Sequence, residues 1–84
     1  MKIYVLVRTF VNTWKDESFT SVIGASIDRK DIEAKRDGLI PEARESFYEH
    51  DSSERKDDDG TWCIWEDEHS VDHYCELQIA ECEI

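Results

Sequence analysis

The residues best able to bind a metal ion lie near the C-terminal end of this 84-residue sequence and begin with a run of aspartates. Asp57–Gly60, followed six residues later by Glu66, partly matches the ligand spacing of an EF-hand calcium loop. The first ligand position, however, falls on Arg55, which is a cation where the leading carboxylate belongs. Side-chain character alternates along residues 61–67, which is typical of a strand rather than of the helix that flanks a calcium loop. We therefore expect a solvated acidic turn and no calcium site.

A second set of possible metal ligands combines two histidines with two cysteines: Cys63, His69, His73 and Cys75. The histidines are four residues apart, a spacing found in zinc fingers. No Cys-x2-Cys pair accompanies them, and both cysteines alternate with large apolar residues, where a cysteine usually acts as a small hydrophobic side chain. The sequence therefore predicts no metal site and no cofactor.

Catalytic groups are not arranged for an obvious reaction. Nucleophilic catalysis needs a Ser or Cys beside a base, and the only ones near a histidine in sequence are Ser70 and Cys75, without a glycine elbow. No glycine-rich phosphate loop is present, and no apolar pocket is evident that would shift the pKa of a carboxylate. We expect no catalytic residue and no enzymatic activity.

Negative charge is concentrated in residues 57–84, which we name the C-terminal hairpin. It holds ten carboxylates and no Lys or Arg, whereas residues 1–56 hold 11 acids and 10 bases, and the whole chain has a net charge of −11. Trp62, Leu77 and Ile79 lie within it, so it is expected to fold rather than to form a disordered tail. Such charge repels nucleic acids and anionic membranes and attracts basic proteins.

Length and composition indicate one domain, residues 1–84, with a small core. The first residues, including Arg8, do not form a signal peptide, and no stretch approaches the ~20 apolar residues of a membrane helix. Three cysteines, an odd number, then indicate reduced thiols and a cytoplasmic protein.

Two strands are expected first, at 2–11 and 18–26, joined by a loop at 12–17. Gly24 indicates a bulge or the close approach of another backbone. Asp28 is expected to cap a helix over 29–37. Gly38 and Pro41 then predict a break before a second helix from 41 to about 50, with a single kinked helix as the alternative.

A polar loop at 51–60 and two strands at 61–67 and 72–82 complete the expected elements. In the last strand Cys75, Leu77 and Ile79 share one face, which is typical of a half-buried antiparallel strand. The predicted fold class is α+β: a small antiparallel sheet, in the order β-β-α-β-β, with a helical segment packed on one face.

Residues 2–6, with their Tyr-Val-Leu core, and 21–25, with Ile23-Gly24, precede the helix that begins at Asp28. This order resembles small bacterial and phage proteins of no known activity. The resemblance covers about half of the chain, implies a β-β-α-β arrangement and does not include the C-terminal hairpin.

Trp62 and Trp65 have opposite parity on one expected strand, so one of them must lie on a second face of the sheet. Tyr4, Leu6 and Phe10 would share that face, which is either covered by loops or forms an interface. We expect a homodimer in which these three residues lie at the interface.

Two functions remain open. The first is an acidic binding or inhibitor protein of phage or mobile-element origin that engages a basic, nucleic-acid-binding protein in place of phosphates. The second is a small structural or regulatory homodimer whose acidity only confers solubility. For the first, the expected partner-binding residues are Asp57, Asp58, Asp59, Glu66, Asp67, Glu68, Asp72, Glu76, Trp62 and Trp65.

Overall fold

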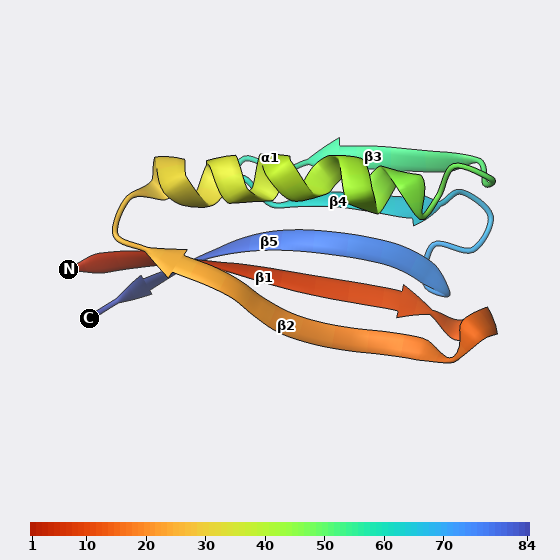
Figure 1. Ribbon diagram of the computed structural model, residues 1–84, viewed down its shortest axis with the longest axis horizontal. Coiled ribbons are helices and arrows are strands. Elements are labelled where there is room, and N and C mark those ends of the chain that lie inside the picture. The colour runs from red at the N-terminus through yellow and green to blue at the C-terminus, as the bar shows by residue number, and fades with distance from the viewer.

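Five antiparallel strands form one sheet, and a single helix crosses one of its faces in the computed structural model, which describes residues 1–84 (Figure 1). The strand order is β2-β1-β5-β4-β3, so the first and last long strands pair at the centre. The predicted α+β class is confirmed. The elements are β1 Lys2–Asn12, β2 Glu17–Ser26, α1 Arg29–Glu45, β3 Ser52–Lys56, β4 Trp62–Glu66 and β5 His73–Glu83.

The core lies between α1 and the sheet. Leu6 pairs with Ile79, and Leu77 pairs with Trp62, so these side chains share the face that α1 covers. The predicted inward side of β5 is confirmed. Nine buried residues form the core cluster: Leu6, Ile32, Ala43, Phe47, Trp62, Ile64, Cys75, Leu77 and Ile79.

The three residues predicted at an oligomer interface, Tyr4, Leu6 and Phe10, lie on this covered face, so Leu6 is not available to a second copy. Leu6 is fully buried, and Tyr4 and Phe10 pack against the core cluster. As predicted, Trp62 and Trp65 lie on opposite faces of the sheet. Trp62 faces the core, is only 4% exposed and shares the covered face with Leu6. Apolar residues lie on both sides of β1, so its sequence does not show which side faces the core. That depends on the face of the sheet on which α1 packs.

The other face of the sheet has no covering layer. We name it the open face. On β1 it presents apolar or hydroxyl side chains, and the register aligns these with small or polar residues of the flanking strands. Its members on the three long strands are Ile3, Val5, Val7, Thr9 and Val11 of β1, Ser18, Thr20, Val22 and Ala25 of β2, and Tyr74, Glu76, Gln78, Ala80 and Cys82 of β5.

A single helix, not two, connects β2 to β3. The predicted cap is confirmed, because Asp28 accepts a hydrogen bond from the backbone N–H of Lys30 at 2.9 Å. The helix runs through Pro41, although proline removes one backbone bond. Burial of Ile32 and Ala43 against the sheet supplies the stability that local sequence does not.

The strand β3 lies inside the segment that was predicted to be a loop. Its residues, Ser-Ser-Glu-Arg-Lys, contain no apolar side chain, so no hydrophobic alternation could indicate a strand. It pairs only with β4 and forms one edge of the sheet. Charged residues on an exposed edge also oppose pairing with another chain.

Gly24 lies at the predicted irregularity in β2. The register with β1 shifts between Leu6 and Val7, opposite Gly24 and Val22. A Cβ atom on Gly24 would lie 3.0 Å from the ammonium nitrogen of Lys35 on α1. The predicted bulge is therefore confirmed, whereas the close contact is with the end of the Lys35 side chain and not with another backbone. No helix of the protein is long and apolar enough to cross a membrane.

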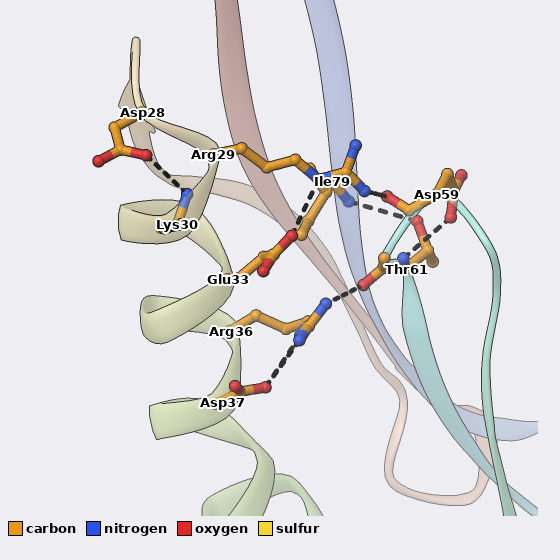
Figure 2. Close-up of polar contacts among 10 residues, drawn as sticks. Asp28, Arg29, Lys30, Glu33, Arg36, Asp37, Asp59, Thr61 and Ile79 are labelled. Atoms are coloured by element: carbon orange, nitrogen blue, oxygen red, sulfur yellow. Dashed lines mark hydrogen bonds and ion pairs between the residues drawn. The ribbon is translucent and has the colours of Figure 1, made fainter.

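Two helix arginines fix the turn between β3 and β4 (Figure 2). The buried Arg36 donates to the carbonyl of Gly60 at 2.6 Å, and Arg29 donates to the carbonyl of Asp59 at 2.7 Å. The carboxylate of Asp59 accepts from the backbone N–H of Thr61 at 2.9 Å. Gly60 has a φ of +90°, a backbone conformation that residues with a side chain rarely adopt. This turn is therefore a structural element and not an open calcium loop.

Candidate functional site

The carboxylates of the C-terminal hairpin do not form one surface. The strand β4 separates the turn at Asp57–Gly60 from the loop at 67–72. Five residues of extended strand span roughly 15 Å, so the two groups of acids lie at opposite ends of the sheet. Glu76 lies between them on the open face. The expected single acidic surface is thus divided into parts, and each part has different neighbours.

One end of the sheet gathers acids from three chain segments, residues 13–17, 49–51 and 67–72, and we name it the acidic end. The backbone N–H of Thr13 donates to the backbone carbonyl of Asp72 at 2.9 Å, and that of Asp67 donates to the backbone carbonyl of Asp51 at 2.9 Å. These contacts hold the segments together at the right of Figure 1. Seven carboxylates lie here, with Lys15 as the single Lys or Arg: Asp16, Glu17, Glu49, Asp51, Asp67, Glu68 and Asp72.

An exposed aromatic side chain lies within the acidic end. Trp14 is 59% exposed and belongs to the 3₁₀ turn Thr13–Lys15 that joins β1 to β2. Its ring packs edge-on against His69, with 4.8 Å between the ring centroids. Tryptophan is enriched among binding hot spots, so Trp14 is a candidate anchor for a partner at this end.

The opposite end, which we name the mixed end, comprises residues 1–2, 26–31, 56–60 and 81–84. It also holds seven carboxylates, but four Lys or Arg accompany them: Lys2, Arg29, Lys30 and Lys56. Glu81 pairs with Lys2 at 2.8 Å, and Glu83 lies 3.4 Å from the terminal amine of Met1. Just beyond these segments, Arg55 pairs with Asp57 at 2.9 Å. Seven acids and four bases leave the mixed end with a side-chain charge of −3, whereas seven acids and one base leave the acidic end with −6.

The two tryptophans expected to bind a partner have different environments. Trp62 is buried under α1 and is not available to a partner, which corrects that prediction. Trp65 is half-buried and lines a hollow of about 480 Å³ with Tyr74 and Glu76. A narrower groove between α1 and β2 measures about 190 Å³ and is smaller than typical ligand pockets of ~300 Å³ or more.

The expected cysteine and histidine set does not come together. Cys63 lies on the open face, and Cys75 lies on the covered face. Burial raises the pKa of the Cys75 thiol to about 11, as expected for a core side chain. His69 packs on Trp14 instead.

A different group of possible ligands does come together beside the acidic end: His50, Glu66 and His73. One nitrogen of each histidine and one carboxylate oxygen lie within 4.8 Å of one another. The Nδ1 atom of His50 is 3.4 Å from Oε1 of Glu66, and the Nδ1 atom of His73 is 3.4 Å from Oε2. The sequence suggested His73 and Glu66 as possible ligands only in two separate sets, and it did not suggest His50, which is distant in the chain.

Aromatic rings hold His73 in a fixed position. Phe47 stacks on its ring with 4.0 Å between centroids, and Phe10 and His50 pack against it edge-on. Burial lowers the pKa of His73, although its contact with Glu66 opposes this shift. His73 is therefore a buried imidazole, packed between aromatic rings, that faces a carboxylate.

Sequence reasoning missed much of the acidic end. Asp16, Glu17, Glu49 and Asp51 lie in the part of the chain that is nearly neutral overall, so local charge did not single them out. The available signal was positional: they lie in connections between elements. In an antiparallel sheet alternate connections meet at the same end.

Comparison with protein-family models, with curated proteins and with solved structures gives no match to this chain. The proposals below therefore depend on the geometry and charge of its own residues.

Proposed function

We propose that this protein binds a basic protein surface, of the kind that normally contacts nucleic acid, through its acidic end. The observation that carries the proposal is the concentration there of seven carboxylates against one lysine. Such an imbalance produces a negative potential that accelerates encounter with a positively charged partner. The same potential opposes direct binding of nucleic acid.

The acidic end is suited to binding because its charges are both free and fixed in place. None of its carboxylates forms an ion pair with Lys or Arg. Backbone hydrogen bonds from Thr13 and Asp67 tie the loops together, so little ordering is required when a partner binds. Exposed Trp14 supplies an apolar anchor beside the charges.

Two variants with the same change of net charge test this proposal. The acidic-end variant carries Glu49→Gln, Asp51→Asn, Glu68→Gln and Asp72→Asn. The mixed-end variant carries Asp57→Asn, Asp58→Asn, Glu81→Gln and Glu83→Gln. Each is immobilised and exposed to a bacterial lysate at low and at high salt, and the captured proteins are then eluted with duplex DNA.

The parent protein and the mixed-end variant should capture basic proteins at low salt and release them to DNA, because DNA competes for the same surface. The acidic-end variant should capture much less. Equal capture by the two variants would show that only net charge matters and would refute the proposal. Capture that DNA cannot displace would argue against a nucleic-acid-binding surface as the target.

A second candidate, a structural or regulatory homodimer, is favoured by the composition of the open face. Of its 14 members on the three long strands, only Glu76 is charged, although 37% of the whole chain is charged. With strand spacings of about 4.8 Å and about 3.3 Å per residue, this face covers roughly 500 Å² on the three long strands. Two such faces bury about 1,000 Å² in total, which is near the minimum for a specific interface. Because Glu76 is the single charged residue among these 14, a second copy can pack on this face with little charge repulsion.

Sedimentation of two matched variants tests the dimer. Val22 on the open face and Ile27 in the connection to α1 are 68% and 69% exposed, so replacing either with lysine should cost similar stability. Val22→Lys should produce monomers, whereas Ile27→Lys should sediment as the parent protein does. A parent that is monomeric at micromolar concentration would exclude this second candidate.

A further inference from the structure

We propose that His50, Glu66 and His73 form a binding site for a zinc-type divalent cation. The three residues come from the segment after α1, the end of β4 and the start of β5. Two imidazoles and one carboxylate are a ligand set that zinc accepts, with a fourth position left for water. This site is distinct from the Cys63, His69, His73 and Cys75 set that the sequence suggested.

The distances in the cluster fit metal ligands better than hydrogen bonds. Both Nδ1-to-carboxylate distances are 3.4 Å, to Oε1 for His50 and to Oε2 for His73, and each is longer than the ~2.7–3.2 Å of a good N–H···O bond. Zinc-ligand bonds of about 2.1 Å in a tetrahedron place neighbouring ligand atoms about 3.4 Å apart. One ligand atom from each residue already lies within 4.8 Å of the others, so the widest gap must close by at most about 1.4 Å. His50 is exposed and can make that movement.

Unpaired buried atoms supply a second observation at the same place. The Nε2 atom of His73 and the Oδ1 atom of Asn12 are buried without a hydrogen-bond partner. These residues are 2% and 8% exposed and pair directly across the β1–β5 ladder, with both side chains on the covered face. Buried polar atoms in proteins are nearly always paired, so these two require an explanation.

A cation at the Nδ1 atom of His73 would remove a conflict between this ring and Glu66. If Nδ1 carries the proton, it reaches Glu66, but Nε2 is then a buried acceptor without a donor. If Nε2 carries the proton, the lone pair of Nδ1 faces the carboxylate of Glu66. A metal ion between Nδ1 and Glu66 removes that repulsion and favours the second arrangement.

The surroundings favour a cation and leave it a route of entry. The acidic end lies beside the cluster and attracts positive ions. Phe47 and Phe10 hold the ring of His73 and exclude water on its inner side. His50 and the loop at 67–72 lie at the surface, so an ion would enter from solvent.

Titration with Zn²⁺ and Co²⁺ tests the site in the intact protein. At a free zinc concentration of roughly 100 times Kd the melting temperature should rise by about 10 °C. Co²⁺ should give the absorption bands of a tetrahedral complex, and Mg²⁺ should have no such effect because it prefers octahedral oxygen ligands. No shift of the melting temperature with Zn²⁺ or Co²⁺ would overturn the proposal.

Matched variants locate the ion. His50→Ala and Glu66→Gln remove ligands that are not fully buried, and each should weaken zinc binding at least about tenfold. His69→Ala and Asp67→Asn are the controls, because they alter a neighbouring histidine and a neighbouring acid outside the cluster, and they should bind zinc as the parent does. Undiminished binding in His50→Ala and Glu66→Gln would refute the site.

Nitrogen NMR of the histidine rings gives an independent reading. Zinc should perturb Nδ1 of His73 and leave its proton on Nε2, whereas the ring of His69 should be unaffected. A shift confined to His69, or a proton on Nδ1 of His73 in the presence of zinc, would contradict the proposed coordination.

Discussion

The two ends of the sheet carry the same number of carboxylates but use them differently. At the mixed end six of the seven accept a hydrogen bond or form an ion pair, and only Asp58 has no partner. At the acidic end only Asp67 and Glu49 accept side-chain hydrogen bonds, both from hydroxyl groups. The other five carboxylates there face solvent or other acids.

The number of carboxylates at one end of the sheet therefore does not determine how many of them are free to interact with a partner. Exposed ion pairs such as Glu81 with Lys2 contribute little to stability, but they do cancel the charge that a partner would meet. The mixed end therefore fixes structure, through its turn at Asp57–Gly60 and its helix cap. The acidic end retains an unmatched potential that can act on a second molecule.

The largest effect should follow from disturbing the turn at the mixed end. Gly60→Ala places a side chain at a φ of +90° and 3.1 Å from both Arg29 and Ile79, so it should cost about 2 kcal/mol of unfolding free energy. Gly38→Ala is the control, because its Cβ meets nothing within 4 Å on the exposed side of α1. That change should stabilise by roughly 0.5–1 kcal/mol in urea unfolding. Equal effects would mean that the turn does not anchor this end.

Acid should weaken the mixed end through Asp59. The backbone N–H of Thr61 donates to this carboxylate and lowers its pKa below the ordinary value of 3.8. A lowered carboxylate pKa gives stability that is present above about pH 4 and is lost as the pH falls through the folded-state value. Asp59→Ala should therefore make the unfolding free energy less dependent on pH between about pH 5 and pH 2.

The neighbouring change Asp58→Ala is the control, since Asp58 makes no contact of this kind. Its pH profile should follow that of the parent protein. If both variants flatten the profile equally, the general charge of the turn, and not the hydrogen bond to Thr61, is responsible.

The smallest effect concerns the stability of the two charge variants. The acidic-end variant should melt a few degrees higher than the parent at low salt, because like charges are removed, and added salt should erase the gain. The mixed-end variant should melt at the same temperature as the parent or slightly lower, since it loses weak ion pairs. Thermal melts at two salt concentrations make the comparison. If the mixed-end variant were more stable than the parent, the ion pairs of the mixed end would not offset the repulsion among its carboxylates.

The main elements of the fold could be predicted because their signals are local. Alternation in β5 placed Cys75, Leu77 and Ile79 on one face, and Asp28 was identified as the helix cap. The strand β3 could not be predicted, since an exposed polar edge strand carries no hydrophobic pattern. Continuation of the helix through Pro41 depends on tertiary packing and not on propensity.

The candidate sites were less predictable because they combine distant segments. Asp51 and Asp67 meet only because two connections share an end of the sheet, and His50 meets His73 for the same reason. The sequence did indicate the relevant residue types, namely carboxylates, histidines and a tryptophan. Which of them become neighbours is decided by strand order, which local patterns do not contain.

The rate of association with poly-L-lysine, at low and at moderate salt, distinguishes the charge of the acidic end from the overall charge of the protein. The acidic-end variant should associate about tenfold more slowly than the parent at low salt and lose most of its salt dependence. The mixed-end variant should remain close to the parent, although its net charge equals that of the acidic-end variant. Equal rates for the two variants would mean that net charge alone explains the binding and that the acidic end has no special role.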